Sequence, residues 1–381
     1  MVNKTSEMGN VGFIELDNGF QPMWKLSPAP CGLLYVPVLL CIALVSWSAR
    51  SQEACTAPEA VCAARDAVFV ISSPFDPLAS AVLVAPGVLV TNRHVVADDT
   101  RVEVLMEGGR RIVGEVVPTR YAGDLVLVRV PGLEGTPLLL GEAGDGLLYA
   151  VGADEADGSI RVYSPGRVLA LPAEDKPLAR LHHAAHSQPG NSGGALVDEN
   201  GRLVGIVTAG GEGRNHAIPV SRLAALEAAS GPPHAAESAS LGRAYRVCIE
   251  SLERGALDAL AKACGASGNR QLFDLAGQAL GQAGRYAPSA QFFRDALEID
   301  PNSVNSMIGL AVTLHLAERW DEEVAVLRHL IERLPADFQV LRLSVQAGKF
   351  AGDNALIERA LAFIGQHHPD ALEAANDFLA Q

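Results

Sequence analysis

A serine flanked by glycines combines two features of a nucleophilic site. In Gly190-Asn191-Ser192-Gly193-Gly194 the glycines permit a sharp backbone turn just before an apolar run. Such a turn can aim two backbone N–H groups at one point beside the serine hydroxyl. The segment can therefore supply a nucleophile and an oxyanion pocket together. Gly-Ser turns are common in loops, so this chemistry also requires a general base and a carboxylate elsewhere in the chain.

His94 is the candidate general base, because an imidazole ordinarily titrates near neutrality and can accept the serine proton. It lies in the segment Thr91-Asn92-Arg93-His94-Val95-Val96, right after the apolar run 87–90, where the end of a strand would present it to a cleft. Asp124 is the candidate orienting carboxylate, because it opens the apolar run 125–130 and a partly buried carboxylate needs a partner. Asp98 and Asp99 are alternatives, in a polar turn that looks solvated.

The elements that position these residues are short and rich in β-branched side chains. Apolar runs separated by Gly, Pro and Asp turns predict many strands with little helix between them, at 68–71, 81–84, 87–90, 101–105, 125–130 and 203–207. This spacing is typical of a barrel or a sandwich rather than a parallel sheet. A short helix is expected at 221–229, and the Gly-Pro-Pro segment after it predicts a linker over 229–238.

From residue 239 the apolar period becomes helical, and a repeat is visible. Pro301, Pro335 and Pro369 are each separated by 34 residues (335 − 301 and 369 − 335). A 34-residue period of paired helices is the signature of tetratricopeptide repeats, which this region resembles over residues 239–381. The third repeat is degenerate, as a terminal repeat can be. The alternative is an unrelated helical bundle.

Five ordered motifs carry a second resemblance. They are Thr-Asn-x-His-Val-Val, Gly-Asp-Leu-Val-Leu, Gly-Asn-Ser-Gly-Gly-Ala-Leu-Val, Gly-x-Leu-Val-Gly-Ile-Val-Thr and His-Ala-Ile-Pro-Val. Together they resemble chymotrypsin-like serine proteases, in the bacterial HtrA-like branch. The resemblance implies two six-stranded β-barrels with the triad His94, Asp124 and Ser192 in the cleft between them. It also implies that the N–H groups of Gly190 and Ser192 form the oxyanion pocket.

The chain departs from HtrA-like enzymes after the protease region, where they usually carry a peptide-binding PDZ domain. Here a helical array takes that place. The expected fold is multidomain, with an all-β double barrel followed by an all-α repeat domain. The expected segments are a tail with a signal peptide or anchor (1–51), a trypsin-like protease domain (63–228), a linker (229–238) and a repeat domain (239–381).

The same resemblance implies which residues select the substrate. His186, six residues before the serine, is expected at the base of the primary specificity pocket, with Thr208 and Gly210 on its wall and His216 nearby. Such a pocket could prefer an acidic side chain or accept a medium apolar one. Alternatively, His186 is a structural residue in a run with two other histidines (182 and 183). No carboxylate or cysteine completes a metal site there, so neither a metal nor a cofactor is expected.

Net charge and an uncharged segment near the N-terminus indicate which partners to exclude and where the protein is located. The formal net charge is −14 without a Lys/Arg cluster, which argues against a nucleic-acid partner. Residues 27–49 hold no charged side chain, which predicts a signal peptide or, alternatively, an uncleaved membrane anchor. We therefore expect a periplasmic or cell-envelope location, with attachment to the inner membrane if the segment is retained.

Cysteine usage fits export. Outside the targeting segment, which holds Cys31 and Cys41, four cysteines remain. The even count suggests disulfides between Cys55 and Cys62 and between Cys248 and Cys264. The last two would face each other across a helix pair. The alternative is that these cysteines are buried free thiols.

The function that these observations favour is an exported serine endopeptidase acting through an acyl-enzyme. Its helical array would bind a protein partner or deliver substrates. The alternative function is a catalytically silent binding scaffold that keeps a protease fold. All three triad residues and the glycines are present, which favours the enzyme.

Overall fold

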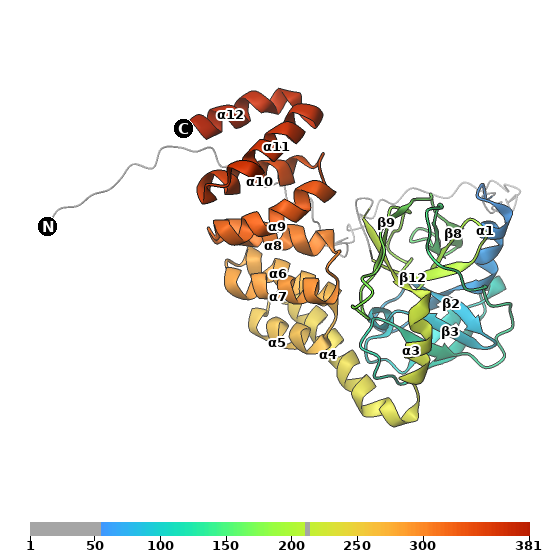
Figure 1. Ribbon diagram of the computed structural model, residues 1–381. Helices are drawn as coiled ribbons and strands as arrows, with labels where there is room; N and C mark the ends of the chain where they lie inside the picture. The colour runs from blue at the N-terminus through green and yellow to red at the C-terminus, as the bar shows by residue number, and fades with distance from the viewer. Residues whose placement is uncertain (1–54, 210–213) are drawn as a thin grey trace, which may run out of the picture. The chain divides into compact units, whose positions relative to one another are not determined.

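Six strands close into a barrel at the start of the folded region. The computed structural model describes residues 55–209 and 214–381 (Figure 1). The strand order around the barrel is β1-β2-β3-β6-β5-β4, with every pair antiparallel. Alternate apolar side chains, such as Leu83, Val104 and Val128, fill the interior. The strands are β1 (Val68–Ser72), β2 (Ala79–Ala85), β3 (Val88–Thr91), β4 (Arg101–Leu105), β5 (Arg111–Val116) and β6 (Val126–Arg129).

Seven further strands form a curled half-barrel with the order β8-β7-β11-β12-β13-β10-β9. The two parts together are the chymotrypsin-like fold expected from the sequence, except that the second part is a seven-stranded sheet rather than a six-stranded barrel. The strands are β7 (Tyr149–Ala153), β8 (Ile160–Val162), β9 (Val168–Ala170), β10 (Leu181–His183), β11 (Ala195–Val197), β12 (Leu203–Ala209) and β13 (Asn215–Pro219).

The barrel and the half-barrel share an apolar core. Val82 and Leu125 from the first part pack in one buried cluster with Val151, Ala195 and Ile206 from the second. Burying such side chains stabilises each by about 1.5–3 kcal/mol relative to exposure. Because both parts contribute to this core, it fixes the position of one part relative to the other. A site built from residues of both parts requires such a fixed position.

Short α-helices and 3₁₀ helices (labelled η) connect and flank the strands, and two of the 3₁₀ helices, η4 and η5, adjoin the longer helices that follow. Helix α2 carries His94, and α3 follows the last strand where the sequence predicted a short helix. The segments are α1 (Glu59–Ala63), η1 (Ala64–Ala67), α2 (Arg93–Val96), η2 (Glu107–Gly109), η3 (Val220–Arg222), α3 (Leu223–Ala228), η4 (Pro232–His234) and η5 (Pro369–Ala371).

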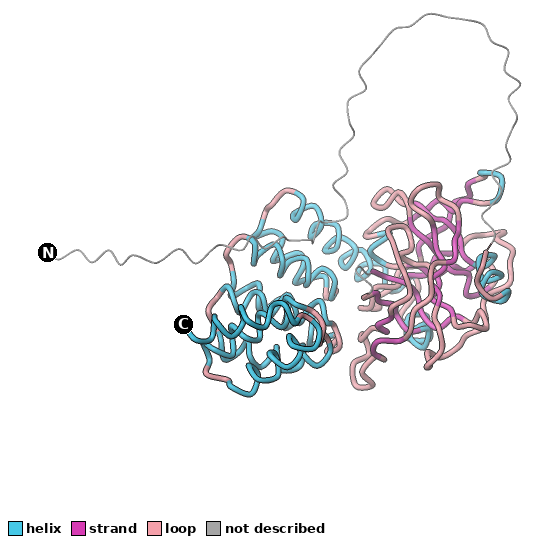
Figure 2. The backbone as a smooth tube through the Cα atoms, turned by 90° about the horizontal axis from the view of Figure 1, so that it is seen from above, coloured by secondary structure: helices cyan, strands magenta, loops and turns pink. Residues whose placement is uncertain are grey.

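The rest of the described chain is helical, as Figure 2 shows by the absence of strand colour there. Helices α6, α8 and α10 begin at Arg270, Val304 and Phe338, which are 34 residues apart (304 − 270 and 338 − 304). The helices are α4 (Ala235–Glu253), α5 (Leu257–Ser267), α6 (Arg270–Gln282), α7 (Tyr286–Ile299), α8 (Val304–Leu316), α9 (Trp320–Arg333), α10 (Phe338–Ala351), α11 (Asn354–His367) and α12 (Leu372–Ala380).

The 34-residue period has a local cause at the helix starts. The residue before each of these three helices, Asn269, Ser303 and Asp337, accepts a hydrogen bond from a backbone N–H of the first turn. Such caps satisfy donors that have no partner inside the helix. The period predicted from the prolines is therefore repeated in the capping residues and in the helix pairs.

Helix α4 begins earlier than the sequence predicted. The expected linker reaches residue 238, but α4 starts at Ala235, directly after the short η4 segment Pro232–His234. The residues that follow the prolines include Ala235, Ala236 and Glu237, which favour helix, and no helix breaker stands among them. The connection between the β region and the helices is consequently short, and residues 54–381 form one compact unit.

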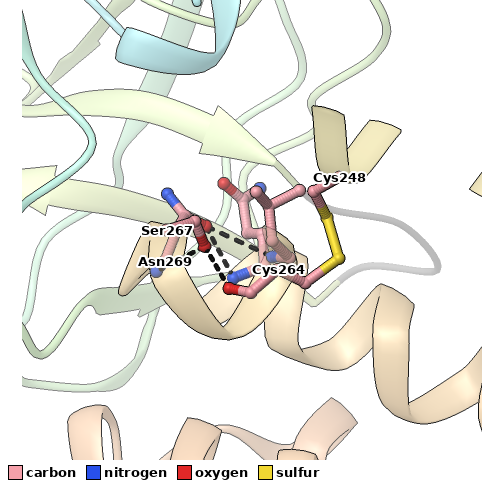
Figure 3. The surroundings of a disulfide bond; sticks show 6 residues. Cys248, Cys264, Ser267 and Asn269 are labelled. Carbon is pink, nitrogen blue, oxygen red and sulfur yellow. Dashed lines mark hydrogen bonds between the residues drawn. A yellow bond between two sulfur atoms is a disulfide. The ribbon is translucent and has the colours of Figure 1, made fainter. Parts of the chain in front are cut away.

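Both predicted disulfides are present, so the free-thiol alternative is wrong. Cys55 and Cys62 are bonded, and Cys248 of α4 is bonded to Cys264 of α5. Figure 3 shows the second bond beside Ser267, whose hydroxyl donates to the carbonyl of Cys264 at 2.6 Å. A cross-link between two helices fixes how α4 packs on α5. Disulfides persist in oxidising compartments, which indicates an extracytoplasmic protein.

The predicted targeting segment, residues 27–49, lies outside the described residues. Within the part of the chain that is described, no helix has the length and apolar character needed to cross a membrane.

Candidate active site

His94 and Asp124 are brought together by the pairing of β3 with β6. Thr91, at the end of β3, pairs with Val126 at the start of β6, so the residues beyond these strand ends become neighbours. The Asp124 carbonyl accepts from the Asn92 side chain at 2.9 Å and from the Arg93 backbone at 3.3 Å. These bonds fix the backbone of Asp124 against the start of α2.

Both carboxylate oxygens of Asp124 face His94. Nδ1 of His94 lies 2.7 Å from Oδ2, and the His94 backbone N–H donates to Oδ1 at 2.9 Å. The Asp124 side chain is fully buried, whereas 14% of the His94 side chain is exposed. The carboxylate thus fixes Nδ1 as the protonated ring nitrogen and leaves Nε2 as the proton acceptor. The alternative acids, Asp98 and Asp99, form ion pairs with Arg246 instead.

The charges of His94 and Asp124 shift the pKa of each other, and both shifts favour the charged forms. Burial raises the pKa of Asp124, but the charge and hydrogen bonds of His94, with the charge of Arg180, outweigh burial and hold that pKa below its ordinary value. Burial lowers the pKa of His94, but the charge and hydrogen bond of Asp124, helped by Asp76, outweigh it and hold that pKa above its ordinary value. Asp124 is therefore ionised at neutral pH and stabilises a protonated His94.

The loop of Ser192 is attached to the first barrel through Ser80 of β2. The Ser80 backbone N–H donates to the Ser192 carbonyl at 2.8 Å, and the Ser80 hydroxyl donates to the Gly190 carbonyl at 2.7 Å. Gly193 has a φ of +82°, and a Cβ there would lie 2.1 Å from the Ser80 carbonyl oxygen. Only glycine permits this close approach of the loop to β2. The hydrogen bonds from Ser80 hold the loop at this position.

The Ser192 hydroxyl donates to the Thr208 carbonyl at 2.8 Å. Among the residues that the structure describes, no hydrogen bond joins it to His94. A bond between the two requires the hydroxyl to rotate away from Thr208. Catalytic hydrogen bonds commonly tighten only when substrate is bound, so this orientation is compatible with a nucleophile.

The two amides expected in the oxyanion pocket are available. Within the described ranges, neither the Gly190 nor the Ser192 N–H donates to a protein acceptor, whereas the Gly193 N–H donates to Val207 and the Gly194 N–H to Asn191. Gly190 has a φ of +92°, a conformation that favours glycine. Unpaired amides beside the serine are the donors that a developing oxyanion needs.

Of the residues expected to select the substrate, His186 is exposed and Thr208 is buried. The ring centroid of His186 lies 5.9 Å from that of Tyr163. Thr208 contributes the carbonyl that holds Ser192, while its hydroxyl donates to the His216 carbonyl at 3.4 Å. Gly210 lies outside the described residues.

His216 belongs to a buried polar chain. Its Nδ1 lies 3.1 Å from Nδ1 of His182, and Nε2 of His182 lies 2.9 Å from Oδ2 of Asp300, at the end of α7. Burial, with nearby positive groups, holds the pKa of His216 well below its ordinary value. In the described part of the chain, no group of three or more His, Cys, Asp or Glu residues is arranged to hold a metal ion.

Three neighbours of His94 and Asp124 were not expected from the sequence. Arg180, itself buried, lies 3.9 Å from Oδ2 of Asp124. Asp76 interacts electrostatically with His94. Tyr245 of α4 lies against the His94 ring. No motif marks these residues, and Arg180 and Tyr245 reach the pair from segments far away in the sequence.

Comparison with known proteins agrees with the fold. Residues 79–206 match the family model described as the trypsin-like peptidase domain. That range contains His94, Asp124 and Ser192. The matched range covers most of the β region, from the start of β2 into β12.

Similar proteins are found among HtrA-type serine proteases. The putative serine protease HhoA of Synechocystis is 31% identical over 160 residues, which cover 37% of this chain and 39% of the relative. The periplasmic serine endoprotease DegP of Salmonella typhimurium is 30% identical over 144 residues, covering 35% of this chain and 30% of the relative. The chain thus matches less than half of the length of either relative.

A solved structure of the HtrA-type protease AlgW with a tripeptide is 28% identical. The match covers 44% of this chain and 61% of that one, with a TM-score of 0.38.

Proposed function

We propose that this protein is an exported serine endopeptidase that hydrolyses peptide bonds of protein substrates through an acyl-enzyme. The observation that carries the proposal is the His94–Asp124 pair, in which a buried carboxylate binds Nδ1 at 2.7 Å. Such a pair converts an imidazole into a general base for a serine. The trypsin-like match at 79–206 and the endoprotease relatives support the same reaction.

Each residue has a role in the reaction. The Ser192 hydroxyl leaves Thr208, attacks the scissile carbonyl carbon and gives its proton to Nε2 of His94. The carbonyl oxygen becomes an oxyanion, stabilised by the N–H groups of Gly190 and Ser192, each worth about 3–4 kcal/mol. Asp124 stabilises the imidazolium. His94 then protonates the leaving amine as the peptide bond breaks, and the acyl-enzyme remains.

Deacylation repeats these steps with water. A water molecule gives a proton to His94 and attacks the acyl carbon, and the same amides bind the oxyanion. The ester bond then breaks, Ser192 recovers its proton from His94, and the acid product leaves. His186, Thr208 and Gly210 are proposed to line the primary specificity pocket, where an acidic or a medium apolar side chain would bind.

The remaining parts of the proposal concern location and partners. Two disulfides support an oxidising compartment, and we assign the periplasm or cell envelope, with residues 27–49 as the export signal or anchor. The helical region, with its 34-residue period, resembles tetratricopeptide repeats and is proposed to bind a protein partner. Neither nucleic acid nor a cofactor has a role in this function.

Hydrolysis of casein tests the proposal. The wild-type protein should release casein fragments, and S192A should reduce the rate by about 10⁶-fold, to background. S221A is the matched control, because Ser221 is exposed outside the site and its substitution should leave the rate unchanged. Absence of cleavage by the wild type, or cleavage that S192A retains, would favour the alternative of a silent binding scaffold.

A further inference from the structure

Helix α4, the first of the helical region, packs directly on α2, the short helix that carries His94. The Tyr245 side chain lies against the His94 ring with centroids 6.4 Å apart and planes inclined by 26°. Tyr245 also meets the Phe75 ring edge-on, with centroids 6.4 Å apart. Tyr245 is 5% exposed, so its ring is packed among its neighbours. Aromatic pairs at such separations interact favourably.

Charged contacts hold the same helix in place. The Arg246 guanidinium forms ion pairs with Asp98 and Asp99, in the turn that follows α2. It also lies over the Phe75 ring, 4.9 Å from the centroid. The Phe75 backbone N–H donates to Asp99 at 3.1 Å. Arg246, the residue next to Tyr245 on α4, is therefore tied to the turn that follows α2 by two carboxylate partners, and such charge-assisted hydrogen bonds are strong and directional.

The close approach of α4 depends on Gly242. A Cβ at this position would lie 2.2 Å from the Ala97 carbonyl oxygen. Ala97 itself has a φ of +47°, which is unfavourable for a residue with a side chain. A strained residue persists where its surroundings fix it. The end of α2, three residues after His94, is thus held in shape by the backbone of α4.

These contacts leave the nucleophile free. In the described part of the chain, no hydrogen bond or ion pair joins the helical region to the loop 190–194, and Ser192 is half-buried. The His94 side chain also keeps 14% exposure. A blocking element would cover the serine or break the His94–Asp124 pair. Here the His94–Asp124 pair is intact.

We infer that α4 is part of the catalytic apparatus, and that Tyr245 is a positioning residue for His94. The inference rests on the proposed peptidase function. The flat ring limits rotation of the imidazole, so that Nδ1 stays on Asp124 and Nε2 stays available to Ser192. Arg246 and Gly242 hold the ring at that place. The β region alone therefore does not suffice for full activity, although it contains all three triad residues.

The test compares steady-state cleavage of a peptide substrate by full-length variants. Y245L keeps apolar volume but removes the flat ring, and its kcat should fall about tenfold or more, because misplacement by about 1 Å can cost on the order of 10²-fold. KM should stay within about twofold, because no substrate contact is lost. Y245F keeps the ring and should restore most of kcat. A residue with only a structural role would not produce this split between kcat and KM.

Two arginines on one helix give a matched control. R246M removes the clamp and should lower kcat several-fold, whereas R243M, at an exposed position three residues earlier, makes the same charge change and should leave kcat unaltered. The comparison of R246M with R243M tests the positioning role of α4 even if Y245L fails to fold.

The outcomes separate this inference from the proposed function. If the wild type does not cleave, the proposed function fails. If the wild type cleaves, while R246M equals R243M and any folded Y245L equals the wild type, the peptidase stands and the positioning role is wrong. Faster cleavage by Y245L or R246M would show an inhibitory contact, which also overturns the inference.

Discussion

The β region and the helical region differ in how their important residues are recognised. In the β region, His94, Asp124 and Ser192 come from segments far apart in the chain, yet each lies in a motif that sequence alone displays. In the helical region, the pattern of capped 34-residue helix pairs is visible, but Tyr245 and Arg246 belong to no motif. Motifs identify the residues proposed to carry out the reaction, whereas the residues inferred to position them are identified only by their contacts.

The largest effect is expected in the β region, for D124N. This change keeps the side-chain shape but favours the wrong imidazole tautomer, and kcat should fall about 10⁴-fold. D145N, at an exposed position, is the matched control and should leave kcat unchanged. Steady-state kinetics on a peptide substrate measures both. A small loss in D124N would mean that Asp124 does not orient His94.

In the helical region the largest effect concerns stability. Replacing both Cys248 and Cys264 by Ser removes the cross-link between α4 and α5, which spans 16 residues. The loss should be about 3 kcal/mol of unfolding free energy, measured by urea denaturation. The change should also lower activity, because α4 carries Tyr245. A variant that is destabilised and yet fully active would weaken the link between the two regions.

The pH dependence of kcat/KM tests the role of the buried His94–Asp124 pair. His94 must be neutral to accept a proton, and its pKa is raised mainly by Asp124, against burial. kcat/KM should therefore fall about tenfold per pH unit on the acid side, with an inflection above the ordinary histidine pKa. In D124N the raising charge is absent, so the inflection should move to lower pH. An unchanged inflection in D124N would contradict this assignment.

The smallest effects compare glycines of the two regions. G193A places a Cβ against the Ser80 carbonyl at a positive φ and should destabilise the protein by about 1–3 kcal/mol. G265A, inside α5, meets open space and should stabilise it by up to about 1 kcal/mol. Thermal unfolding measures both. Equal shifts would show that the Ser192 loop is not constrained as described.

Much of the fold was predictable because its signals are local. The run 101–105 predicts β4 with the observed bounds, and the cysteine spacing predicts both disulfides. Strands such as β9 and β10 were not predicted. They have three residues each, and β10 contains two histidines, so neither shows an apolar alternation. Pairing with neighbouring strands stabilises them instead.

The site was predictable where a residue type is required by chemistry. His94 and Asp124 lie just beyond strand ends, where a polar residue near an apolar run is conspicuous, and the structure pairs them. Arg180 was not predictable, because a lone arginine in a loop resembles any surface residue until tertiary packing buries it near Asp124. The same holds for Tyr245, whose sequence position indicates only a helix core.

Whether His94 activates Ser192 can be measured with a fluorophosphonate probe. The purified full-length protein should be labelled, with the adduct located on Ser192 by mass spectrometry, because an activated serine hydroxyl attacks the phosphorus of the probe, gives up its proton to the base and displaces fluoride. S192A should not be labelled, and H94A should be labelled far more slowly. Absence of labelling in the wild type, or labelling that persists in S192A, would contradict the account.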